Sequence, residues 1–144
     1  MIKYFFISSI ILLTLSLEAQ EVKENWIPIS IEKDESLFIN VNGISSFLGD
    51  DIFIWSLQEL NPPMTMEEVK GDIFKVKTYY LINKRLMRYS ILDIIFYDLN
   101  NNVLKNYHYE NKYQNPEFKY NYPIIRNSEV DKILTKALEF IPKN

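Results

Sequence analysis

The chain has 144 residues, which is the length of one ordinary domain. Hydrophobic side chains make up 47% of the chain, so we expect a packed core, and a chain that is disordered throughout is excluded. Aromatic side chains make up 15% and there are only 3 glycines. This composition favours β-structure and excludes collagen-like proteins and glycine-loop nucleotide-binding proteins. The net charge of −3 argues against nucleic acid as a partner, and the absence of cysteine excludes disulfides, zinc–cysteine sites and thiol nucleophiles.

The first nineteen residues have the organisation of a signal peptide. Lys3 supplies a positive charge, residues 4–17 form an apolar stretch, and Ala19 is a small residue at which a signal peptidase could cut. The stretch is shorter than the roughly 20 apolar residues of a transmembrane helix. We therefore expect cleavage after Ala19, a single mature domain of residues 20–144 without a membrane span, and a secreted, periplasmic or cell-surface location. The alternative is an N-terminal anchor that stays in the membrane.

Alternating hydrophobicity predicts six strands after this segment. They span residues 25–32, 37–41, 51–58, 71–82, 86–98 and 103–109. Pro28 places the first strand at an edge of the sheet, and Asn42-Gly43 predicts a turn with positive φ before a single helical turn at 44–48. Residues 60–68 are expected to be a loop, because Pro62 and Pro63 cannot continue a ladder. The strand 86–98 is apolar on both faces and is expected to be central.

Residues 128–141 are predicted to form one amphipathic helix, with Ser128 as its N-cap and Asp131 as the capping-box partner. The apolar stripe consists of Val130, Ile133, Leu134, Ala137, Leu138 and Ile141. Because the sheet is the only surface that can bury this stripe, Ile133, Leu134 and Leu138 are expected to pack on it. The predicted fold class is therefore α+β, an antiparallel β-sheet meander with a C-terminal α-helix packed on one face.

The residues that carry chemistry do not form a recognisable catalytic or metal-binding set. His108 is the single histidine, and it is expected to be structural or exposed because it lacks the histidine or cysteine partners of a metal site. Residues 98–102 begin like a calcium loop, but Val103 and Tyr109 occupy the positions of the loop glycine and the bidentate glutamate. A hairpin turn at 99–102 is the better interpretation.

The carboxylates are likewise interpreted as structural. Asp93 interrupts an apolar face of the strand 86–98 and is expected either to pair with a cation such as Arg88 or to lie at an edge. The adjacent pairs 50–51 and 67–68 point to opposite sides of an extended chain and are interpreted as solvated loop charge. We therefore predict no catalytic residues, no cofactor and no metal.

An aromatic segment is the best candidate for a binding surface, because tyrosine offers a large, fairly rigid contact area with a polar tip. The candidate partner-binding residues are Tyr107, Tyr109, Tyr113, Phe118, Tyr120 and Tyr122. The alternative is that the two strand tyrosines are ordinary sheet residues and the others pin an irregular loop to the sheet.

The order of motifs resembles the surface-adhesin protein E family of small exported bacterial proteins. The resemblance covers 26–141, and its most specific parts are IFIWSL at 52–57 and the Tyr-Asp-x-Asn hairpin. The supporting segments are Trp26, FINVNGI at 38–44, VKTYYLINKRLMRYSI at 76–91, FYDLNNNVL at 96–104 and the terminal helix.

This resemblance implies an antiparallel sheet with a helix on it, displayed outside the cytoplasm. It also implies a binding or adhesin-like function without catalysis, host extracellular-matrix or serum proteins as partners, and a homodimer. The alternative function is a periplasmic structural or accessory role. Members often carry one cysteine where Asn83 or Lys84 stands and another in the terminal helix; this chain has neither, so its helix must dock by apolar packing alone.

Overall fold

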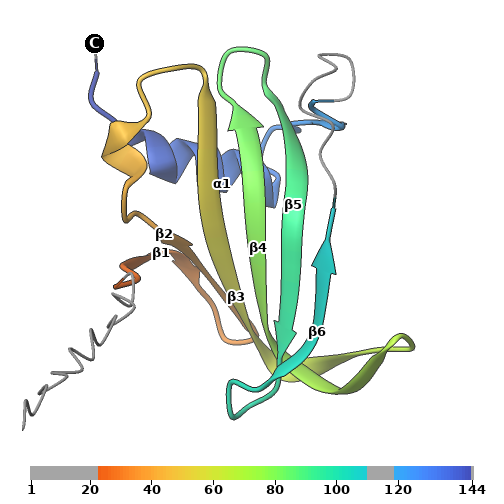
Figure 1. Cartoon of the computed structure of the whole chain (residues 1–144). Helices are drawn as coiled ribbons and strands as arrows, with labels where there is room; N and C mark the ends of the chain where they lie inside the picture. The colour runs from red at the N-terminus through yellow and green to blue at the C-terminus, as the bar shows by residue number, and fades with distance from the viewer. Residues whose placement is uncertain (1–22, 110–118, 144) are drawn as a thin grey trace, which may run out of the picture.

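A computed structural model describes residues 23–109 and 119–143 of the chain. Its elements are β1 (Trp26–Ile31), β2 (Glu35–Asn40), the 3₁₀ turn η1 (Ile44–Ser46), β3 (Asp51–Met66), β4 (Val69–Asn83), β5 (Arg88–Tyr97), β6 (Val103–His108), β7 (Tyr122–Pro123) and α1 (Glu129–Leu138). The structure confirms the predicted α+β class, since a six-strand antiparallel meander carries one C-terminal helix across one of its faces (Figure 1).

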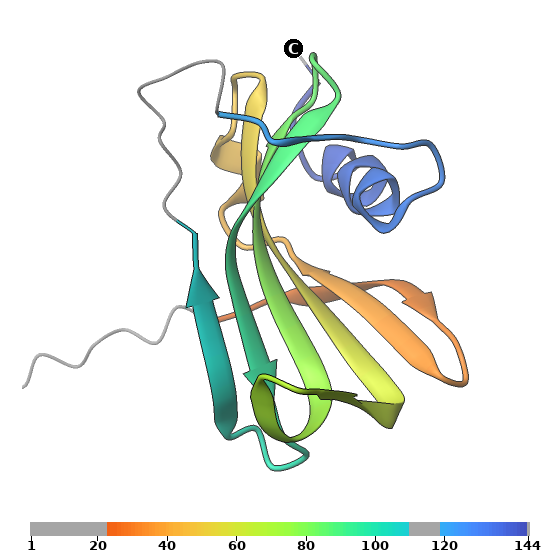
Figure 2. The ribbon, with the colours of Figure 1, turned by 90° about the vertical axis from the view of Figure 1, so that its right-hand side faces the viewer.

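The strands are ordered β1-β2-β3-β4-β5-β6, so that β1 and β6 form the two edges of the meander. The short strand β7 pairs with the start of β5. Figure 2 shows that β1, β2 and the β3–β4 hairpin curve toward the side on which α1 lies. Because neighbouring strands are antiparallel, the turns β1–β2, β3–β4 and β5–β6 lie at one end of the sheet, and the remaining connections lie at the other end.

Several local predictions are confirmed. Pro28 lies in the edge strand β1, Gly43 has a φ of 76° directly before η1, and Asn101 has a φ of 64° in the β5–β6 hairpin. The Asp98 carboxylate accepts hydrogen bonds from the backbone N–H groups of Asn100 and Asn102, both at 2.8 Å. The hairpin interpretation of this segment therefore holds, because side-chain oxygens stabilise a turn here.

The predicted loop at 60–68 is wrong. Strand β3 continues to Met66 and β4 begins at Val69, so this region is a long hairpin. The prolines lie where the ladder is interrupted, since no pair falls between Glu59 and Met64. Pairing with β2 also ends at Leu60. Proline is tolerated because neither neighbouring strand needs its missing N–H group.

The main core lies between α1 and the sheet. Ile39, Ile52, Ile82 and Ile133 have no exposed surface, and branched aliphatic side chains dominate. The buried members are Leu37, Ile39, Ile44, Ile52, Ile54, Tyr80, Ile82, Val130, Ile133, Leu134, Ala137 and Ile141. A second cluster of Val69, Ile73, Val76 and Phe96 lies beneath the β3–β4 hairpin. The bent sheet therefore holds two apolar clusters.

The helix follows the predicted stripe with one exception. Ile133 and Leu134 are buried, but Leu138, the last residue of α1, is 39% exposed. The expected burial of Leu138 is wrong because this residue lies at the rim of the helix–sheet contact, where it lines a surface hollow. Ser128 is the N-cap as predicted, since the Asp131 N–H donates to Ser128 Oγ at 3.3 Å. The reciprocal bond of a capping box is not formed, because the Ser128 N–H donates to the carbonyl oxygen of Ile125 instead. The Asp131 carboxylate in turn accepts from the Asn127 N–H at 2.8 Å.

Candidate functional site: the open face of the sheet

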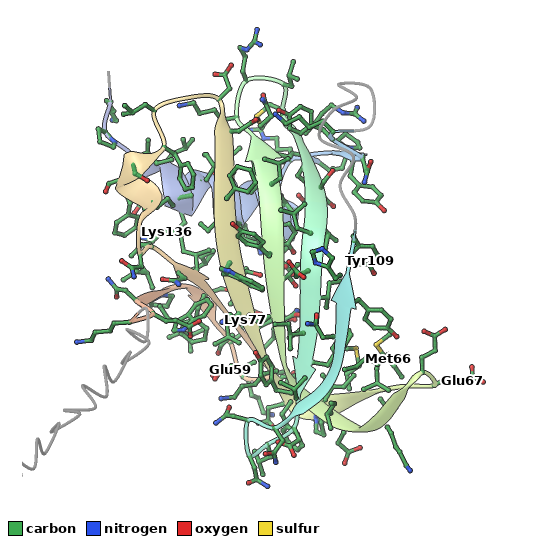
Figure 3. All side chains as sticks on the ribbon, viewed as in Figure 1. Glu59, Met66, Glu67, Lys77, Tyr109 and Lys136 are labelled. Atoms are coloured by element: carbon green, nitrogen blue, oxygen red, sulfur yellow. The ribbon has the colours of Figure 1, made fainter. Side chains whose placement is uncertain are left out.

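The face of the sheet opposite α1, here called the open face, is the best candidate for a functional surface. Side chains alternate along a strand, so the residues between the buried isoleucines of β3 point away from the helix. In Figure 1 the helix lies behind the sheet, and no described helix or strand crosses in front of β3 and β4. Figure 3 shows Lys77 and Glu59 on this near side.

An aromatic row crosses the open face. The rings of Trp55 on β3 and Tyr79 on β4 stack with their centroids 4.6 Å apart and an interplanar angle of 17°. Phe53 lies 6.2 Å from Tyr79, and Phe47 lies 6.0 Å from Phe53. All four side chains are partly exposed. Rings that stack across strands cover one another, which explains how this face persists without a layer above it.

Lys77 extends the row toward β1. Its Nζ atom lies 4.9 Å from the ring centre of Trp55 and 5.5 Å from that of Trp26. The Glu24 carboxylate forms an ion pair with Lys77 and accepts a hydrogen bond from Trp26 Nε1 at 3.1 Å. Partial burial opposes ionisation of Glu24, but the hydrogen bonds from Lys77 and Trp26 outweigh burial and lower the pKa of this carboxyl. The two charges and two rings therefore hold one another in place.

Next to this row the open face is hollowed by a shallow depression of about 370 Å³. It is lined by Glu24, Trp26, Leu57, Lys75, Lys77, Tyr97 and Asn101. Lys75 also forms an ion pair with Glu59 at 3.3 Å. The depression is lined by aromatic and aliphatic side chains together with charged groups, which is the usual composition of a recognition site.

Asp93 lies on the open face but not with the predicted partner. Its carboxylate contacts His108 Nδ1 at 2.6 Å. The side chain of Arg88 instead donates to the carbonyl oxygen of Tyr120 at 3.1 Å. The expected Asp93–Arg88 pair is wrong because His108 of β6 lies directly opposite Asp93, whereas Arg88 lies five positions earlier in β5, beside Tyr120. A bulge in β5, where the register shifts between Tyr79 and Tyr80, turns Asp93 from the face of Tyr89 to the open face. The expectation that His108 is exposed holds, since its side chain is 70% exposed.

The carboxylate of Asp51 is also not a solvated loop charge. It accepts hydrogen bonds from Asn83 Nδ2 at 2.7 Å, Tyr120 Oη at 2.5 Å and Lys119 Nζ at 2.6 Å. Partial burial opposes its ionisation, but the three donors outweigh that effect and hold the pKa of Asp51 below its ordinary value. No local pattern in the sequence predicts this cluster, since its members lie up to 69 positions apart.

The same cluster fastens residues 119–121 over one end of the open face. Ser90, which has no exposed surface, donates to the carbonyl oxygen of Lys119 at 2.9 Å and accepts from the Asn121 N–H at 2.9 Å. We call residues 119–121 the strap. Its hydrogen bonds to Asp51 and Ser90 explain why the chain crosses the sheet at this point.

The structure places the predicted partner-binding aromatics among separate sets of neighbours. Tyr107 packs edge-on against Phe96 and donates to the Glu68 carboxylate at 3.0 Å. Tyr122 lies 5.4 Å from the ring of Tyr89. Tyr120 belongs to the Asp51 cluster, and Tyr109 is 48% exposed beside β6 (Figure 3). Tyr113 and Phe118 fall outside the described residues. The aromatic row was missed because its members come from different strands.

Within residues 23–109 and 119–143 there is no group of three or more histidine or acidic side chains that could hold a metal ion. No helix in this described part of the chain is long and apolar enough to cross a membrane. The predicted signal peptide falls outside the described residues.

Comparisons with protein families, with curated proteins and with solved structures found no match to this chain.

Proposed function

We propose that this protein is an exported bacterial envelope or surface protein that acts as a binding module and catalyses no reaction. The observation that supports this proposal is the open face, where an aromatic row and a depression lie on the side of the sheet away from α1. Aromatic side chains with a charged rim are enriched at the centres of protein interfaces.

The rigidity of the open face favours such a role. Trp26, Trp55 and Lys77 are held by mutual contacts and by Glu24, so little side-chain entropy is lost when a partner binds. The alternation of aliphatic and aromatic residues in β3 and β4 gives one face to the core and leaves the other for contact. By the resemblance to the protein E family, the partner proposed is a host extracellular-matrix or serum protein.

Binding to immobilised matrix and serum proteins tests this function. The double variant Trp26→Ala/Tyr97→Ala removes two rings from the depression, and it should weaken binding by about 30-fold or more if either ring is an interface anchor. The matched control is Tyr109→Ala/Tyr122→Ala, which removes two aromatic side chains that are 48% and 50% exposed elsewhere. Circular dichroism should show both variants folded.

The binding of the two double variants distinguishes the open face from the tyrosines predicted from the sequence. Loss of binding in the first variant alone places the contact on the open face. Loss in the control alone returns the contact to the tyrosines predicted from the sequence. If no matrix or serum protein binds the unaltered protein, the adhesin-like proposal is wrong and the structural or accessory role becomes the better hypothesis.

A further inference from the structure

The two ends of the sheet differ in charge. The turns β1–β2, β3–β4 and β5–β6 and the strand residues beside them carry seven carboxylates against three lysines, Lys33, Lys70 and Lys105. The carboxylates are those of Glu32, Asp34, Glu35, Glu67, Glu68, Asp72 and Asp98. At the opposite end the β4–β5 turn carries Lys84 and Arg85, and Lys143 follows the helix. The carboxylates at this end are paired, Asp50 with Arg85 and Glu139 with Lys136, which leaves the charges of Lys84 and Lys143 unbalanced. We call these two ends the acidic end and the basic end. The charge is therefore distributed asymmetrically along the strands, although the net charge of the protein is −3.

A hollow of about 420 Å³ opens at the basic end. Phe47 and Leu48 line it from the connection after η1, Lys84 from the β4–β5 turn, and Leu138, Ile141 and Lys143 from the end of the helix and the residues after it. No carboxylate is among its lining residues, and neither lysine forms an ion pair with any described residue. A hollow lined by apolar side chains and two cations suits a ligand that is both anionic and apolar.

Apolar side chains extend from this hollow into solvent. Leu48 is 68% exposed and Leu138 is 39% exposed at its rim. Leu86 and Met87, which follow Lys84 in the same turn, are 50% and 41% exposed. Large exposed apolar residues that gather with cations at one end of a domain indicate an interaction surface rather than the scatter of single residues found on any protein.

We propose that the basic end docks peripherally on an anionic lipid bilayer, with the lysines at the headgroups and the exposed leucines and methionine inserted at the interface. Charge complementarity selects this occupant, because a negative surface attracts Lys84 and Lys143 and repels the acidic end. A protein with a net charge of −3 gains from such a surface only in this orientation. Docking there leaves the open face, which runs along the strands, accessible to a partner.

Vesicle sedimentation tests the electrostatic part of the proposal. The full chain should bind vesicles that contain phosphatidylglycerol more tightly than vesicles of phosphatidylcholine alone. Lys84→Glu/Lys143→Glu should weaken binding to the anionic vesicles by about tenfold or more. The matched control, Lys33→Glu/Lys70→Glu, makes the same charge change at the acidic end and should bind much as the unaltered chain does. Because every variant keeps the same N-terminal segment, any membrane affinity of that segment is common to all of them.

Spin labels test the insertion. The chain has no cysteine, so Leu48→Cys carries a unique label at the hollow, and Leu99→Cys carries one on a residue that is 65% exposed in the β5–β6 turn. On anionic vesicles the label at position 48 should become protected from a water-soluble relaxation agent, whereas the label at 99 stays accessible.

The proposal is overturned if the two double variants bind alike or if both labels stay accessible. It is also overturned if the variant at the basic end loses self-association or binding of an acidic protein while vesicle binding persists. Binding to matrix and serum proteins is measured without lipid, so failure of this proposal is distinct from failure of the proposed function.

Discussion

The covered and open faces of the same sheet are stabilised in different ways. On the covered face, Ile39, Ile52 and Ile82 lose all contact with water beneath α1. On the open face, Trp55, Tyr79 and Lys77 stay partly exposed and stabilise one another by stacking and cation–π contacts. Burial of aliphatic surface scales with the area removed from water, whereas an aromatic row works at partial exposure. The second face can therefore stay available for binding without being unstable.

The largest effect is expected on the covered face. Leu134→Ala removes a side chain that is 3% exposed between α1 and the sheet, and it should lower the free energy of unfolding by about 2–5 kcal/mol. Leu138→Ala is the matched control on the same helix and should cost much less because Leu138 is 39% exposed. Urea unfolding measures both. Equal losses would show that α1 is not docked through Leu134.

The next effect concerns the strap on the open face. Asp51→Asn removes the charge that accepts from Lys119 and Tyr120, and it should cost about 1.5–3 kcal/mol because hydrogen bonds to charged groups are strong. Asp50→Asn is the control. Asp50 pairs with the exposed Arg85 at 2.7 Å, and such surface pairs contribute at most about 1 kcal/mol.

The pH dependence sharpens this test. The pKa of Asp51 is lowered in the folded state, so its contribution is complete above its ordinary pKa and is lost as the pH falls through the lowered value. The unaltered protein should therefore lose its advantage over Asp51→Asn in acid. An advantage that is independent of pH would mean that shape rather than charge fastens the strap.

A smaller effect is expected for the contact between two rings of the aromatic row. A double-mutant cycle of Trp55→Leu and Tyr79→Leu should give a coupling of about 0.5–1.5 kcal/mol, since the rings stack at 4.6 Å. The control cycle pairs Trp55→Leu with Tyr97→Leu, which share no ring contact among the described residues, and its coupling should be near zero. Equal coupling in both cycles would contradict a specific stack.

The smallest effect is expected where α1 begins. Burial raises the pKa of Glu129, and the negative charge of Glu35 adds to this, although Tyr80 donates to its carboxylate at 3.3 Å. A raised carboxyl pKa means that the folded state loses stability as the pH rises through it, so Glu129→Gln should gain stability relative to the unaltered protein between about pH 4 and pH 7. The gain should stay below about 1 kcal/mol, because the substitution also removes a favourable charge from the helix N-terminus. Thermal melts at both pH values measure it, and a loss at neutral pH would contradict the assignment.

Local sequence patterns predicted which strands and helix are present, but they did not predict how far the strands β3 and β4 extend. Alternation located the strands, and the helical stripe located α1 with its Ser128 cap. The rule against proline in strands failed at Pro62 and Pro63, because a ladder can be interrupted there and resume at Met64. Whether an N–H group is needed depends on the neighbouring strands, which no local window of sequence contains.

The candidate site was predicted less well than the fold. The tyrosines between 107 and 122 were grouped because they are near in sequence, yet Tyr107 and Tyr120 contact different neighbours. The sequence places Trp26, Trp55 and Tyr79 in three different strands, and only the pairing of β3 with β4 brings Trp55 and Tyr79 together. The odd positions of β3 carried a usable signal, since Phe53, Trp55 and Leu57 are large and apolar on the face away from the isoleucines.

The sequence by itself determined the class of the fold, the order of strands and helix, and the helix residues that reach the core apart from Leu138, because these follow from periodicity and from the conformations that each residue prefers. The tertiary structure alone decided that Asp93 meets His108, that Asp51 fastens the strap, and that the exposed leucines gather with two lysines at one end. Those contacts join positions up to 69 residues apart and depend on a bulge in β5 and on the curvature of the sheet. A shift of one residue in strand register exchanges the two faces, so such contacts are fixed only when the whole sheet has formed.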